Sequence, residues 1–166
     1  MATLVASMTA SQLLAHLVGD YVIQSDEMAV TKTRATRWAA YHAVTYGLPF
    51  LALTRSPIAL AFIVVTHFVV DRWRLARFLC WTKNFVFSGW TWTSTSAFVG
   101  WFLALGAFRG VRVPDAVWSP HRRPWSECTR TGYPDVRDAW MTVWLMIIAD
   151  NVCHIAFNAV ALWAWP

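Results

Sequence analysis

The sequence predicts an all-α fold, a polytopic transmembrane helical bundle that forms a single domain over residues 1–166. Three observations lead to this prediction. Charged residues make up 14% of the chain, whereas a typical soluble domain has about 25%. Apolar segments alternate with short basic segments, as they do in multi-pass membrane proteins. In three of these apolar segments a histidine and an aspartate lie four residues apart, which places both on one face of a helix.

The first apolar segment runs from about residue 4 to residue 24 and is the least hydrophobic of the set. His16, Asp20 and Gln24 fall on one stripe of the predicted helix, because they follow one another at intervals of four. A polar linker at 25–37 comes next and contains three basic residues. The first predicted helix therefore carries a polar stripe on an otherwise apolar surface.

Two more apolar segments follow the linker. The second runs from about 38 to 53, is short for a membrane span, and carries His42 near its start. A tight turn at 54–57 ends in Pro57, a residue suited to the first turn of a helix. The third segment is therefore predicted as one helix over about 58–79, ending in a basic cluster.

The last apolar segment, at about 139–165, contains Asp150 and His154 and is long enough to span a bilayer with tilt. Before it, residues 109–138 form a polar loop with four prolines and six arginines. Residues 85–108 are ambiguous: they carry no charge, and their strongest apolar stretch covers about 12 residues, against the ~20 that a span needs.

The distribution of lysine and arginine predicts the orientation, because cytoplasmic segments carry the excess of these residues. The linker holds three and the end of the third segment four, against one in the turn between them. This places the N-terminus outside, in a bacterial cytoplasmic (inner) membrane. The loop 109–138 lies inside if residues 85–108 form a re-entrant or interfacial helix. We therefore predict about four spanning helices plus one such element, with five spans as the alternative.

The recurring His/Asp pairs point to a shared site. The pairs are His16 with Asp20, His67 with Asp71, and Asp150 with His154. Random placement predicts roughly 0.4 such pairs, and ionisable residues inside a bilayer are costly and usually functional. The predicted topology also places Asp20, His42 and the third-segment pair at a similar depth near the cytoplasmic side, so they are expected to converge.

Imidazole and carboxylate groups together favour a divalent metal ion, most of all zinc or manganese. The number of candidate ligands exceeds the three or four of one zinc site, so a centre with two metal ions is an alternative. Such two-metal centres favour phosphoester hydrolysis. The predicted metal ligands are His16, Asp20, His42, His67, Asp71, Asp150 and His154. The predicted catalytic residues among them are Asp20, Asp71 and Asp150.

Further polar residues flank this candidate site: Gln24, Lys32, Arg72, Arg74 and Asn151. The two amides would orient the ligands or join helices, and the basic residues would contact an anionic head group or set the topology. The alternative for the whole cluster is structural, because Asp and His one turn apart can simply hydrogen-bond and hold a membrane bundle together.

Composition excludes other classes of function. The net charge of +5 comes from basic residues between apolar segments, where they contact lipid head groups, so no nucleic-acid partner is expected. The three cysteines form no CxxC unit. The expected partner is the lipid bilayer, and the oligomeric state stays open.

The residues quoted above resemble a membrane family of bacteria and phages catalogued as domain of unknown function 3307. The matching blocks are residues 16–24, Lys32, His42, residues 67–71 and residues 150–154. Asn151 and Arg74 depart from the Gln and Lys that members tend to have there. A more distant similarity is to small membrane proteins described as metal-dependent hydrolases. The resemblance implies an integral membrane protein and supports metal binding.

Two functions follow from these expectations. The first is a membrane-embedded metal-dependent hydrolase that acts on a lipid or lipid-linked phosphate. The second is a non-enzymatic membrane protein in which the His/Asp cluster is a structural polar core or an ion or proton relay.

Overall fold

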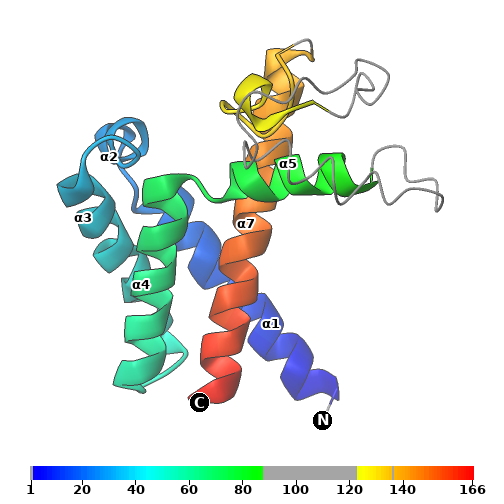
Figure 1. Cartoon of the computed structure of the whole chain (residues 1–166). Helices are drawn as coiled ribbons and strands as arrows, with labels where there is room; N and C mark the ends of the chain where they lie inside the picture. Colours follow the sequence, from blue (N-terminus) through cyan, green and yellow to red (C-terminus); the bar gives the residue numbers. More distant parts are fainter. Residues whose placement is uncertain (1, 88–122, 136) are drawn as a thin grey trace. The chain divides into compact units, whose positions relative to one another are not determined.

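A computed structural model describes residues 2–87, 123–135 and 137–166, and every regular element among them is helical (Figure 1). The predicted all-α class is therefore confirmed. Contacts divide the chain into two units, residues 1–75 with 150–166, and residues 76–149. The division falls inside the last helix, and each unit is described by itself.

The first unit holds the N-terminal helices and the C-terminal part of the last one. Its helices are α1 (Ala2–Leu17), the π-helix η1 (Val18–Val22), α2 (Asp26–Thr31), α3 (Thr36–Gly47), the 3-10 helix η2 (Leu48–Ala52), α4 (Pro57–Trp73) and the later turns of α7 (Ala139–Ala164). Helices α3 and α4 pack against each other. A small apolar core of this unit includes Tyr46 from α3, Phe50 from η2 and Ile63 from α4.

Local sequence signals set the helix ends. The Ser56 hydroxyl caps α4 by accepting a hydrogen bond from the Ala59 N–H at 3.4 Å, and Pro57 opens the helix as predicted. The predicted third segment at 58–79 is not one helix, however. Arg74 has a left-handed backbone conformation (φ 51°) that ends α4, and α5 (Ala76–Phe87) begins two residues later.

The second unit contains α5, a short 3-10 helix η4 (Trp125–Glu127) and the first turns of α7. The Trp81 indole N–H donates to the Arg123 carbonyl at 3.0 Å, and Phe78 stacks on Trp125 with ring centroids 4.4 Å apart. These contacts fix part of the predicted loop 109–138 against α5. The predicted non-crossing element at 85–108 lies, from residue 88 onwards, outside the described residues.

The prediction of four spanning helices is not supported by the described residues. Among them one helix, α7, is long and apolar enough to cross a membrane. Its 26 residues extend about 39 Å, compared with a hydrocarbon core of about 30 Å. The 17 residues of α4 and the 12 of α3 extend about 26 Å and about 18 Å. Helix breaks at Gly47 and Arg74 shorten the segments that the apolar pattern had joined.

Candidate metal centre

Four side chains of the first unit converge on one point: Asp20 from η1, His42 from α3, and His67 with Asp71 from α4. One ligand atom of each lies within 4.8 Å of those of the other three. The four side chains are at most 8% exposed. The group therefore combines two imidazoles and two carboxylates in a place that water barely reaches.

Helix geometry explains why these residues meet. His67 and Asp71 lie one turn apart on α4, and the neighbouring α3 turns His42 toward them. Asp20 is carried by the π-helix, a wider turn that changes the direction of the side chains on it and is frequent at functional sites. Gly19 lets this turn approach closely, because a Cβ there would lie 2.7 Å from Tyr46 Cδ2 and 3.0 Å from the Tyr46 carbonyl oxygen.

The spacing of the donor atoms matches that of ligands around one ion. His42 Nε2 lies 2.9 Å from His67 Nε2 and 3.1 Å from Asp20 Oδ1. Asp71 Oδ2 lies 3.1 Å from His67 Nε2 and 3.2 Å from His42 Nε2. With metal–ligand bonds of about 2.0–2.2 Å, neighbouring ligands are roughly 3.0 Å apart in an octahedron and roughly 3.4 Å apart in a tetrahedron. The residues present therefore fit a divalent ion.

Packing, and not a hydrogen bond from the second ring nitrogen, orients the two imidazoles on the side away from the cluster. The Nδ1 atoms of His42 and His67 are buried and have no hydrogen-bond partner among the described residues. Instead, the Tyr46 ring stacks on His67 with centroids 3.6 Å apart and an interplanar angle of 15°. This arrangement differs from most metal-bound histidines, in which the second nitrogen donates to an acceptor.

Lys32 places a positive charge beside the cluster. Its Nζ lies 2.8 Å from Asp71 Oδ2 and 3.9 Å from Asp20 Oδ1, and it donates a hydrogen bond of 2.8 Å to the Gln24 side-chain oxygen. Burial lowers the pKa of Lys32, but the two carboxylates outweigh burial and hold this pKa above its ordinary value. Lys32 is therefore charged and partly compensates the two aspartates.

Asp150 and His154 on α7 extend the cluster. His154 Nε2 lies 3.4 Å from Asp150 Oδ2 and 3.5 Å from Asp71 Oδ1. Ligand atoms of Asp20, Asp150 and His154 form a second group within 4.8 Å of one another. Asp20 belongs to both groups, so its carboxylate could contribute to the binding of a divalent ion in either one.

His16 lies beside these groups and not within them. Its Nδ1 lies 2.9 Å from the Tyr46 hydroxyl, and its Nε2 lies 2.6 Å from Asn151 Oδ1. Both ring nitrogens are therefore engaged, and Nδ1 also lies 3.9 Å from Asp20 Oδ2. Asn151, predicted as a flanking residue, takes part through this bond.

The two flanking arginines lie at the end of α4. Arg72 donates from Nη1 to the Thr33 carbonyl at 2.9 Å and from Nε to the Thr36 hydroxyl at 3.3 Å. It thereby ties the segment between α2 and α3 to the end of α4. Arg74 forms the left-handed end of that helix.

Three contributors were missed by the sequence prediction: Gln12, Tyr46 and Asn158. Asn158 donates to the Tyr46 hydroxyl at 2.6 Å, and Gln12 donates to the Ile155 carbonyl at 2.6 Å. Each lies four residues from a predicted ligand on its own helix. The four-residue spacing that identified the His/Asp pairs would have found all three, had it been extended to neutral polar residues.

Comparisons with known proteins give one match. The family described as "Protein of unknown function (DUF3307)" matches residues 8–101. The matched region contains the group of Asp20, His42, His67 and Asp71 and ends before α7. No curated protein and no solved structure matches the chain.

Proposed function

We propose that this chain, which belongs to the DUF3307 family of unknown function, is an integral membrane protein that binds a divalent metal ion through Asp20, His42, His67 and Asp71. The observation that carries the proposal is the convergence of four buried donor atoms at ligand spacing. Imidazole together with carboxylate suits zinc or manganese. The second group around Asp150 and His154 provides for another ion.

The distribution of apolar side chains supports a membrane location. In the first unit Leu14, Val44 and Val65 are more than half exposed, while His16, His42 and His67 are at most 1% exposed. This arrangement, with apolar side chains outward and ionisable ones inward, is typical of a membrane bundle and the reverse of a soluble core. Helix α7, the one helix of span length in the part of the chain that the structure describes, would then form a multi-pass protein together with shorter helices.

Charge supports hydrolysis as the chemistry of the site. A bound divalent ion would lower the pKa of a coordinated water to about 7 and provide hydroxide for attack on a phosphate ester. Two carboxylates and Lys32 carry a net charge of −1, so a divalent ion with one hydroxide makes the buried group neutral. Asp150, with 27% of its side chain exposed, is the carboxylate closest to solvent and is suited to accept a proton. The proposed substrate is a lipid or lipid-linked phosphate.

The test is a comparison of two histidines. Full-length protein is purified in detergent, stripped with a chelator and titrated with zinc or manganese against a competing chelator. Four-ligand zinc sites are worth about 10–16 kcal/mol, so losing one ligand in His67→Asn should weaken binding roughly a hundredfold. His16→Asn should keep affinity within about tenfold, because His16 acts only through neighbours.

Two results would contradict metal binding. One is wild-type protein that takes up no stoichiometric divalent ion. The other is equal loss of affinity in both histidine variants, which would place the ion elsewhere.

Hydrolysis is tested separately on the metal-loaded protein. A phosphomonoester and phosphatidic acid in micelles serve as substrates, with His67→Asn as the inactive control.

A second function, a metal-free polar core or proton relay, is favoured by one observation. The Lys32 ammonium lies 2.8 Å from Asp71 and already supplies a cation to the cluster. In such a core the ring protons of His42 and His67 would lie on Nε2 and be donated to carboxylates. The Nδ1 atoms of both rings would then be buried hydrogen-bond acceptors that no donor among the described residues reaches, which counts against this second function.

Lys32→Met separates the two functions. If the cluster binds metal, removing a positive charge next to the ligands should raise the affinity for zinc at least about tenfold. The Lys32 ammonium would no longer compete with the ion for the Asp71 carboxylate and would no longer repel it. The measurement is the same competition titration. A metal-free polar core predicts a different result: zinc binds neither the wild type nor Lys32→Met, and the variant is less stable in chemical unfolding.

A further inference from the structure

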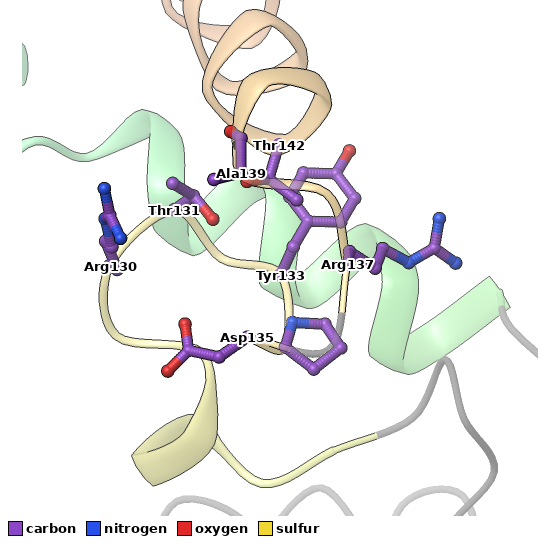
Figure 2. Close-up of a pocket in the computed structure, with 8 residues that line it drawn as sticks. Arg130, Thr131, Tyr133, Asp135, Arg137, Ala139 and Thr142 are labelled. Carbon is purple, nitrogen blue, oxygen red and sulfur yellow. Dashed lines mark hydrogen bonds between the residues drawn. The ribbon is translucent and has the colours of Figure 1, made fainter.

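A small polar cavity in the second unit lies where the first turn of α7 meets the preceding loop (Figure 2). Its volume is about 90 Å³. The lining includes Arg130, Thr131, Tyr133 and Arg137 from the loop, and Thr142 from α7. None of these residues belongs to the proposed metal centre, so the cavity is independent of the function proposed above.

The electrostatics of the cavity favour an anion. Arg130 and Arg137 line it, against the one carboxylate of Asp135 among its described residues. Ala139 and Thr142 also line it, so the N-terminal end of a 26-residue helix borders the cavity. The first turn of α7 has no acidic side chain, and the unpaired N–H groups of a helix start attract negative charge.

A buried hydroxyl independently points to a ligand. Thr131 is 3% exposed and lines the cavity, and Figure 2 shows its side-chain oxygen on the cavity side. Thr131 makes no hydrogen bond among the described residues. The hydroxyl is therefore available to donate to an acceptor oxygen placed in the cavity, and a hydrogen bond to a charged acceptor is worth more than one to a neutral group.

The volume limits the size of the ligand. Each water needs about 10–15 Å³ of such space, so the cavity holds several waters or a group of similar bulk. Whole small-molecule ligands occupy about 300–1,000 Å³. A tetrahedral oxyanion fits, and its several acceptor oxygens suit guanidinium groups, a hydroxyl and backbone N–H groups together. We propose that this cavity binds a phosphate group, carried by a lipid head group or present as free phosphate.

The experiment uses the full-length protein in nonionic detergent micelles. One arm measures radiolabelled inorganic phosphate by equilibrium dialysis. The other measures retention of phosphatidic acid by native mass spectrometry, with diacylglycerol of the same chains as the phosphate-free control. Binding in the first arm identifies free phosphate as a ligand. Preference for phosphatidic acid over diacylglycerol, without binding in the first arm, identifies the head group.

Matched variants assign the binding to the cavity. Thr131→Val keeps the shape and removes the hydroxyl, and should weaken binding about tenfold, whereas Thr131→Ser should keep it. Combined Arg130→Gln and Arg137→Gln should weaken it at least about tenfold, while Arg123→Gln, an arginine of the same unit paired with Glu127 at 3.8 Å, should not.

Two outcomes would overturn the proposal. The first is that neither inorganic phosphate binds nor phosphatidic acid is preferred over diacylglycerol. The second is that binding occurs but is the same in wild type, Thr131→Val and the double arginine variant. Near-ultraviolet circular dichroism of each variant checks that the tryptophan-rich second unit keeps its fold. If Thr131→Val does not fold, the double arginine variant is compared with Thr131→Ser and wild type instead.

Discussion

Asp71→Asn should abolish metal binding and also destabilise the first unit, the largest combined effect expected from a single substitution in this chain. Asp71 Oδ2 lies 2.8 Å from Lys32 Nζ and 3.1 Å from His67 Nε2, and Asp71 Oδ1 lies 3.5 Å from His154 Nε2. The amide keeps the shape of the side chain and removes its charge. The affinity for zinc should fall at least about a hundredfold, because one of four ligands worth about 10–16 kcal/mol together is lost.

The loss of stability has a separate cause. Lys32 would keep its buried charge without its closest carboxylate, and removing one partner of a buried ion pair costs about 3–5 kcal/mol. Chemical unfolding in detergent, followed by circular dichroism, measures this cost in the metal-free protein. The matched control is Asp26→Asn, an exposed aspartate in the first turn of α2, which should leave both readouts unchanged.

The two readouts separate the candidate functions. A polar core without metal predicts the loss of stability alone, because no ion is bound in wild type either. Wild-type affinity for zinc in Asp71→Asn would contradict the metal site even if the variant were less stable. Equal stability of Asp71→Asn and wild type would contradict the Lys32–Asp71 pairing.

Gly132→Ala should unfold or strongly destabilise the second unit. Gly132 has φ +81°, and a Cβ at this position would lie 2.1 Å from the Arg77 carbonyl oxygen and 2.8 Å from the Trp81 backbone nitrogen. Both close atoms are backbone atoms of α5, which cannot yield by rotating a side chain. A left-handed conformation costs about 1–2 kcal/mol for an L-residue and overpacking about 1–3 kcal/mol, so the expected cost is about 2–5 kcal/mol.

The measurement is the near-ultraviolet circular dichroism of the tryptophans, which include Trp81 and Trp125 packed edge to face in this unit. Phosphate binding should be lost in parallel, because Thr131 and Tyr133 flank Gly132 in the cavity wall. Gly47→Ala is the comparison: a Cβ there would meet one side-chain atom, a methyl group of Val64, and no backbone atom, so its cost should be smaller and confined to the first unit. A Gly132→Ala protein with wild-type spectrum and stability would contradict the close packing on α5.

The four-residue spacing of polar residues carried most of the sequence prediction. It placed His67 and Asp71 on one face, and in the structure they meet Asp20 and His42 in one group. Spacing along one helix cannot show which neighbouring helix a side chain faces, so the contacts of His16 with Tyr46 and Asn151 could not be predicted.

Helix ends were harder to predict than helix faces. Pro57 is a local signal, and α4 begins there. Arg74 gives no such signal, since arginine rarely adopts the left-handed conformation that ends this helix. An apolar pattern also continues across Gly47, where α3 gives way to a 3-10 helix. Gly47 and Pro49 give a local signal for the first break, whereas tertiary packing decides the break at Arg74. The described residues therefore contain one helix of span length where the apolar pattern predicts several.

The π-helix η1 forms the C-terminal end of the N-terminal helix, directly after α1. A π-turn accommodates roughly one residue more than an α-turn, so side chains near its end point in a different direction from those of an uninterrupted α-helix, by up to about 100°. Gln12 and His16 precede this slip and contact Ile155, Tyr46 and Asn151. Asp20 lies within it and turns toward His42. The polar stripe of this helix thus contacts α3 at two levels, Tyr46 and His42, and α7 at Asn151. Deletion of one residue between Val18 and Val22 should turn the Asp20 carboxylate away from His42.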